Sequence, residues 1–135
     1  MEYSTLDKLG VRVSRLGFGC MRFPLTAEGK IDEPRASAML DTAYKAGVTY
    51  YDTAYFYHQH TGEAFLGRAM KRYPRDTFYL ATKMPMSIVE SLDHAKEIFE
   101  GQLAALQTDY VDFYLLHAVN GERWKQAQEM GIVGF

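Results

Sequence analysis

VDFYLLH, at residues 111–117, is an apolar strand-like run that ends in a histidine, and with two upstream runs of the same form it decides the fold. Residues 48–51, VTYY, lead into Asp52, and residues 78–82, FYLAT, lead into Lys83. Helical patterns separate the three runs, which is typical of repeated strand–helix units and a parallel sheet. In a barrel of such units the carboxyl ends of the strands form the active-site face. The sequence therefore predicts a carboxylate, an ammonium and an imidazole in one layer of an enzyme site.

Two further elements precede these runs. Residues 3–16 alternate loosely around Gly10, which predicts a short hairpin with a positive φ at that glycine. Residues 16–21, LGFGCM, predict the first strand of the barrel, and their glycines permit another group to approach the backbone closely. The expected order is a hairpin followed by four strands with a helix between each pair.

Three helices are expected between the strands. The first has Asp32 as its N-cap, and the second runs from near Thr61 to a stop before Pro74. The third begins with a capping box formed by Ser87 and Glu90. Its apolar stripe comprises Ile88, Leu92, Ala95, Ile98, Phe99, Leu103 and Leu106.

The predicted architecture is the N-terminal half of a (β/α)8 TIM barrel of the α/β class, with about four strand–helix units. A complete barrel needs roughly 250 residues, and the chain has 135. We expect one partial domain over residues 1–135, with the hairpin at 3–16, the strand–helix units at 16–135 and no second domain. A fourth helical pattern begins at Arg123 but is followed by neither a polar cap nor a strand stop, so the chain is expected to be truncated.

The composition narrows the class of protein. Lys and Arg total 15 against 17 for Asp and Glu, and this near balance argues against a nucleic-acid partner, which would require a basic stripe. The single cysteine excludes an intrachain disulfide. The first residues lack the features of a signal peptide, and no apolar run approaches a membrane span. We expect a soluble cytoplasmic protein without a membrane partner.

Tyr57 follows Asp52 by five residues and is the candidate proton donor of the predicted site. A free phenol is a poor acid, and stabilising its anion for work near neutral pH requires roughly 4 kcal/mol. One ammonium about 4 Å away, at an effective dielectric near 20, supplies about that energy. Lys83 is the candidate ammonium and Asp52 its carboxylate partner. His117 would hydrogen-bond the reacting oxygen or share the proton, so the four residues form a proton donor for a carbonyl that receives a hydride.

Each of the four residues also has a plain structural explanation when taken alone. Asp52 would cap the next helix, and Tyr57 is one of ten tyrosines. Lys83 would be a solvated loop lysine, and His117 a structural histidine at the end of an apolar strand. Together these explanations weaken, because three separate strands would have to end in ionisable groups in one layer by chance.

A metal site is the alternative interpretation of two histidines in the loop after Tyr57. His58 and His60 have the spacing of metal ligands, and a metal-dependent barrel hydrolase would combine them with Asp52 and His117. No further carboxylate cluster accompanies them, so we prefer two polar loop histidines at the rim of a cleft and predict no metal site. Cys20 is expected to be a buried or cleft-lining small residue rather than a nucleophile, because no base lies near it in sequence.

Several segments resemble motifs of the aldo-keto reductases. DTAYFY at residues 52–57, followed by GEAFLG at 62–67, is similar to the family's Asp-Thr-Ala-x-x-Tyr…Glu-x-x-Leu-Gly motif. ATK at 81–83 resembles the family's lysine strand, and LAALQTDYVDFYLLH at 103–117 resembles the helix-to-strand motif that ends in the catalytic histidine. Residues 9–19 match the plug hairpin and the first strand. The family commonly has glycine where this chain has His58 and His60.

The resemblance implies the NADPH-dependent reduction of an aldehyde or ketone to an alcohol by hydride transfer, with NADP(H) as the cofactor. The implied catalytic tetrad comprises Asp52, Tyr57, Lys83 and His117. Tyr57 would be the general acid, Lys83 its activating partner, Asp52 the support for Lys83, and His117 the residue that orients the substrate. The implied cofactor contacts are Gly19, Cys20, Met21 and Asp52.

The resemblance also suggests partners and an alternative function. The expected partner is a small-molecule carbonyl compound, whose identity the sequence does not reveal. The family's second half, which carries most of the cofactor-binding residues, has no counterpart here, and the open half-barrel is expected to aggregate or self-associate. Some relatives keep the barrel but act as regulatory subunits, so a cofactor-sensing module is the second interpretation.

Overall fold

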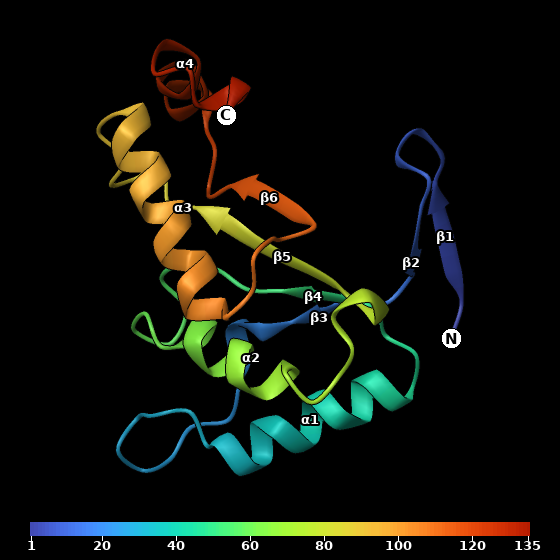
Figure 1. Ribbon diagram of the computed structural model, residues 1–135. Coiled ribbons are helices and arrows are strands. Elements are labelled where there is room, and N and C mark those ends of the chain that lie inside the picture. The colour runs from blue at the N-terminus through green and yellow to red at the C-terminus, as the bar shows by residue number, and fades with distance from the viewer.

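The computed structural model describes residues 1–135 and shows a four-stranded parallel sheet with helices on one side (Figure 1). The strands follow the order β3 (Phe18–Gly19), β4 (Tyr50–Asp52), β5 (Tyr79–Met84) and β6 (Phe113–Leu116). Between them run the helices α1 (Glu33–Lys45), α2 (Gly62–Met70) and α3 (Leu92–Leu106), and α4 (Gly121–Glu129) follows β6. This is the α/β half-barrel that the sequence predicts.

The N-terminal hairpin lies at the amino ends of the strands. Its strands, β1 (Tyr3–Leu6) and β2 (Val11–Ser14), pair antiparallel, and Gly10 has a φ of 63° in the turn, as expected. The Ser14 hydroxyl accepts a hydrogen bond from the backbone N–H of Thr49, just before β4. Figure 1 shows the hairpin projecting from this end of the sheet, so the other end stays free for the candidate site.

The first barrel strand is shorter than predicted. A strand was expected over residues 16–21, but β3 contains only two residues. The backbone turns into a 3₁₀ helix over Cys20–Arg22, and Cys20 is completely buried there. The turn therefore ends the strand where the chain passes from the sheet into the core.

The start of the third helix was predicted incorrectly. The N-cap is Ser91, whose hydroxyl accepts from the N–H of His94, and not Ser87. Ser87 lies in a turn in which the N–H of Ile88 donates to Pro85, so Ile88 falls outside the helix. The turn allows two residues of this segment, Met86 and Val89, to bury their side chains in the core.

The other predicted helix starts agree with the structure or lie close to the observed ones. The Asp32 carboxylate accepts from the N–H of Arg35 at the start of α1, and Pro34 lies in the first turn, where its missing N–H costs nothing. The fourth helix starts at Gly121, two residues before the predicted Arg123. None of these helices has both the length and the apolarity needed to cross a bilayer.

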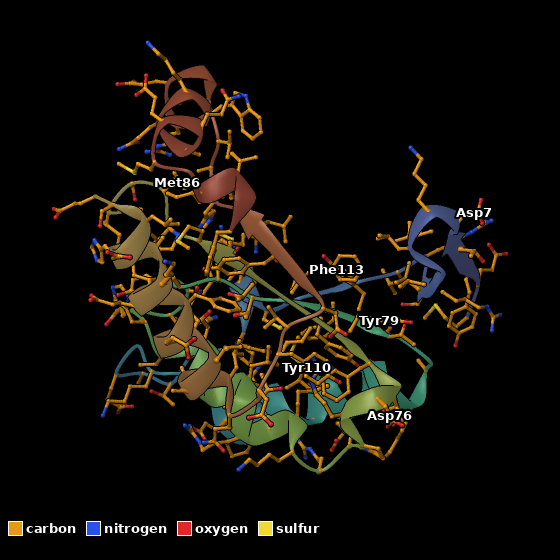
Figure 2. The ribbon with its side chains drawn as sticks, turned by 45° about the horizontal axis from the view of Figure 1, so that its top comes forward. Asp7, Asp76, Tyr79, Met86, Tyr110 and Phe113 are labelled. Carbon is orange, nitrogen blue, oxygen red and sulfur yellow. The ribbon has the colours of Figure 1, made fainter.

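The sheet has a covered face and an open face. On the helix side, Tyr51 and Leu80 are buried in the larger hydrophobic core, beneath α1 and α2. The inner face carries aromatic rings that contact one another, with Phe113 5.2 Å from Tyr50 and 6.1 Å from Tyr79 between ring centroids. Figure 2 labels Phe113 and Tyr79 on their neighbouring strands. Phe18, by contrast, packs against the helix-side core.

We expect opposite effects on stability from adding one methyl group to two helical glycines. A Cβ at Gly67 in α2 would lie 2.5 Å from the backbone oxygen of Leu106 in α3, so Gly67→Ala should lower the free energy of unfolding by about 1–3 kcal/mol. A Cβ at Gly101 meets nothing within 4 Å, and Gly101→Ala should raise that free energy by about 0.5–1 kcal/mol. Chemical denaturation of both variants checks this, and a tolerated Gly67→Ala would mean that α2 and α3 are not closely packed.

Candidate active site

The strand register places three ionisable residues on one face of the sheet. One rung of the sheet consists of Gly19, Asp52, Ala81 and Phe113. Lys83 lies two residues beyond Ala81, and His117 lies four residues beyond Phe113. Because side chains alternate between faces with a period of two, these even steps keep Asp52, Lys83 and His117 on the inner face. The advance of two residues from strand to strand matches the stagger of tilted strands in a barrel.

The Lys83 ammonium is the centre of the candidate site. Its Nζ lies 2.6 Å from Asp52 Oδ1, 2.6 Å from the backbone oxygen of Thr53 and 3.3 Å from the Tyr57 hydroxyl. The Lys83 side chain is 14% exposed. An ammonium has three N–H donors, and each has an oxygen partner here, so the position of Nζ is fixed. The predicted neighbourhood of Lys83 with Asp52 and Tyr57 is confirmed.

His117 completes the group. The backbone N–H of His117 donates to the Met84 oxygen at 2.9 Å, which continues the strand pairing one residue past β6. Its imidazole centroid lies 6.0 Å from that of the Tyr57 ring, and the two rings are nearly perpendicular. All four residues of the predicted tetrad therefore lie at the carboxyl ends of β4, β5 and β6 or in the loops just after them.

Burial lowers the pKa of the His117 imidazole below its usual range. The charges of Lys83 and Arg123 lower this pKa further, whereas the Asp52 carboxylate opposes them. Near neutral pH the ring is therefore neutral, and one of its nitrogens is a hydrogen-bond donor while the other is an acceptor.

The lowered pKa of His117 predicts how stability depends on pH. The unfolded chain binds the proton more readily than the folded chain, so this contribution to stability is present above the ordinary pKa of 6.5 and is lost as the pH falls through the lower folded value. We expect the free energy of unfolding to decline with pH in this window, and His117→Asn to flatten that decline. Denaturation at a series of pH values measures it, and an identical slope in the variant would contradict the assignment.

The loop after Tyr57 has an unusual backbone. His58, Gln59 and His60 have φ values of 51°, 54° and 66°, in the left-handed region that favours glycine. Glycine would adopt this conformation without strain, which agrees with the glycines that the resemblance implies at the positions of His58 and His60. His58 compensates through its side chain, whose ring stacks on Phe23 and whose Nε2 lies 3.1 Å from the Cys20 oxygen. His58 is therefore a structural support for the turn after β3.

The residues expected near a cofactor differ in accessibility. Gly19 is exposed at the end of β3, opposite Asp52, and a Cβ built there meets nothing within 4 Å, so a ligand has room to approach its backbone. Met21 is 47% exposed. The Cys20 side chain is fully buried, and burial raises the pKa of its thiol. A contact from Cys20 is therefore restricted to its backbone.

Two features lie outside the tetrad: the histidines of the metal alternative and a cavity at the other end of the sheet. No group of three or more His, Cys, Asp or Glu side chains is arranged to hold a metal ion, and this includes the four residues of the hydrolase alternative. A half-open cavity of about 540 Å³ lies at the amino ends of β5 and β6, lined by residues such as Asp76 and Tyr110. Figure 2 labels both residues, which precede β5 and β6 in the chain, so the cavity lies at the end of the sheet opposite the carboxyl ends that carry the tetrad.

Sequence reasoning missed a buried polar cluster behind Lys83. Glu63, Thr82 and Gln102 are each at most 5% exposed and hydrogen-bond to one another. Gln102 offered a signal, because it occupies a core-facing position in α3 between Ile98 and Leu106, where an apolar residue is expected. A glutamine at such a position predicts a buried hydrogen-bond network.

The chain is similar to known proteins over most of its length. A model of the aldo/keto reductase family matches residues 15–126. Probable aldo-keto reductase 1 of Glycine max is 31% identical over 123 residues, covering 85% of this chain and 36% of the relative. A probable voltage-gated potassium channel subunit beta of Oryza sativa subsp. japonica is 31% identical over 125 residues, covering 87% and 37%. A solved aldo-keto reductase from Klebsiella pneumoniae in complex with NADPH is 26% identical with a TM-score of 0.73, covering 96% and 47%.

The chain thus spans about half the length of that solved structure and less of the two curated relatives. The range that the family model matches, residues 15–126, includes the hairpin-to-β3 connection, the tetrad positions and α3. The family model covers well over half of the chain, and the solved reductase shares its strand and helix arrangement. This chain therefore belongs to the aldo/keto reductase family.

Proposed function

We propose that this chain supplies the proton-donating half of an NADPH-dependent reductase that converts an aldehyde or ketone to an alcohol. The observation that carries the proposal is the contact of Lys83 Nζ with both Asp52 and the Tyr57 hydroxyl. A positive charge at that distance favours the phenolate, which is the form that Tyr57 takes after it donates its proton. The similarity to a reductase solved with NADPH supports the same chemistry.

Each residue of the tetrad has a distinct task in this proposal. Tyr57 donates its hydroxyl proton to the carbonyl oxygen, and Lys83 stabilises the phenolate that remains. Asp52 holds the ammonium in place and balances its charge. His117, neutral near pH 7, orients the carbonyl through a ring nitrogen.

NADPH would supply the hydride, which is chemistry that no side chain provides. The exposed backbone of Gly19 and the exposed Met21 lie at the end of β3, on the strand next to the one that ends in Asp52, and would border the cofactor. The tetrad and part of the cofactor border are therefore what this half contributes.

A second candidate is a cofactor-sensing subunit, which the similarity to a channel beta subunit favours. The two candidates differ in turnover, because a sensor binds NADPH with negligible consumption. A full-length protein that contains this chain should consume NADPH when generic aldehydes are added. Tight NADPH binding without consumption across an aldehyde and ketone panel would favour the sensor.

A further inference from the structure

Glu63 is a buried carboxylate that the tetrad chemistry does not use. It lies in the first turn of α2 and is 5% exposed. Its Oε1 accepts from the Thr82 hydroxyl at 2.5 Å and from Gln102 Nε2 at 2.7 Å. Burial raises the pKa of this carboxyl, while the two hydrogen bonds and the Lys83 charge oppose the rise. A carboxylate is costly to bury, so its retention in the core calls for a specific role.

The two residues that hydrogen-bond to Glu63 are both connected to the backbone of Lys83. Thr82 directly precedes Lys83 in β5, and Gln102 Nε2 also lies 3.2 Å from the backbone oxygen of Lys83. Tyr114 in β6 donates its hydroxyl to Gln102 Oε1 at 2.7 Å, which directs the amide nitrogen toward Glu63. The hydrogen bonds of Glu63, Thr82 and Gln102 therefore fix the position of the Lys83 backbone from the helix side of the sheet.

Glu63 is also coupled to Tyr57 through the backbone. The N–H of Gly62, one residue before Glu63, donates to the Tyr57 oxygen at 3.2 Å. A Cβ at Gly62 would lie 3.0 Å from that same oxygen, so the Tyr57 backbone packs tightly on the start of α2. The Glu63–Thr82 bond is thus a side-chain link between the helix that anchors Tyr57 and the strand that carries Lys83.

We propose that Glu63 is a positioning residue that sets the separation of Tyr57 and Lys83 by fastening the start of α2 to β5. This inference rests on the proposed function, but the separation of Tyr57 and Lys83 can be tested without measuring turnover. The titratable groups that contact Tyr57 are Lys83 from β5 and His117 after β6, and Asp52 from β4 acts on it through its ion pair with Lys83. A loosened α2–β5 link moves Tyr57 away from Lys83.

Three substitutions in a full-length protein that contains this chain separate geometry from charge. Glu63→Ala and Glu63→Gln remove the same charge, but only glutamine keeps an oxygen that accepts from Thr82 and Gln102. Thr82→Val keeps the charge and the side-chain shape but removes the link. We expect kcat to fall by about 10²-fold in the alanine variant, with KM nearly unchanged, and to recover in the glutamine variant. Thr82→Val should resemble the alanine variant.

A readout independent of turnover is the distance between Lys83 Nζ and the Tyr57 hydroxyl in crystal structures of the apo proteins. This distance is 3.3 Å in the present structure. We expect it to lengthen by about 1 Å in Glu63→Ala and Thr82→Val, because the link between α2 and β5 is lost. Glu63→Gln should leave it close to the wild-type distance.

The control for general destabilisation is Ser14→Ala. Ser14 is a buried polar residue whose hydroxyl bonds Leu16 and Thr49 at the opposite end of the sheet, so its loss should lower stability without changing the distance between Lys83 and Tyr57. An equal lengthening of that distance in Ser14→Ala, or equal behaviour of the alanine and glutamine variants, would overturn the proposal. Thr82→Val decides the case if Glu63→Ala does not fold. A wild-type protein without turnover counts against the proposed function, whereas the distance between Lys83 and Tyr57 in the variants still decides this inference.

Discussion

Replacing Tyr57 by phenylalanine in a full-length protein that contains this chain is expected to lower carbonyl reduction by about 10²–10⁴-fold, because the loss of one general acid has that effect. The substitution removes only the hydroxyl that lies 3.3 Å from Lys83 Nζ. The ring keeps its place against Lys83 and His117, so NADPH affinity should stay nearly unchanged. Steady-state kinetics and a cofactor titration on the same preparation measure both effects.

Tyr55→Phe is the matched control for this experiment. Tyr55 lies two residues away and packs against Phe56 and His60, and its hydroxyl has no hydrogen-bond partner in the structure. Removing that hydroxyl should leave turnover unchanged. Near-normal reduction by Tyr57→Phe would show that another group donates the proton and would reject the role assigned to Tyr57.

Residues 1–135 on their own are expected to show no measurable carbonyl reduction and to bind NADPH far more weakly than the full-length protein. Four strands do not satisfy the strand number, tilt and shear of a closed eight-stranded barrel. In this half, β3 and β6 each have a neighbour on one side only. Leu115 on the inner face is 40% exposed, and Tyr50, Tyr79 and Phe113 on the same face are only partly buried. We expect self-association or aggregation through this face.

Sedimentation and a fluorescence titration with NADPH test the isolated half. A version of the chain extended to the length of its relatives and measured under the same conditions would be the control, because a closed barrel would cover the inner face of these strands. A compact monomer of residues 1–135 that unfolds cooperatively and binds NADPH as well as the full-length protein would refute this prediction.

The placement of the tetrad side chains follows from local sequence rules. Asp52, Lys83 and His117 each follow an apolar run, and the alternation of side chains fixes their common face once the strands are parallel. The N-terminus of α1 could be predicted for the same reason, because Asp32 and Pro34 act on the first turn of that helix. Short-range patterns therefore predicted the fold and the convergence of the site.

The features that sequence reasoning missed depend on distant partners. Ser87 and Ser91 are equally able to cap a helix, and the burial of Met86 and Val89 in the core selects Ser91. The role of Gln102 depends on Glu63, 39 residues earlier in the chain. Local sequence patterns do not predict such contacts, because the partners are far apart in the chain and meet only in the folded molecule.

The most direct test of the central claim follows the hydride itself. A full-length protein that contains this chain is given an aldehyde that it turns over and NADPH deuterated at the transferable position of the nicotinamide ring. The account predicts that deuterium appears on the carbinol carbon of the alcohol in proportion to the NADPH consumed. An alcohol without deuterium, or bound NADPH that is never consumed with any carbonyl compound, would contradict the account.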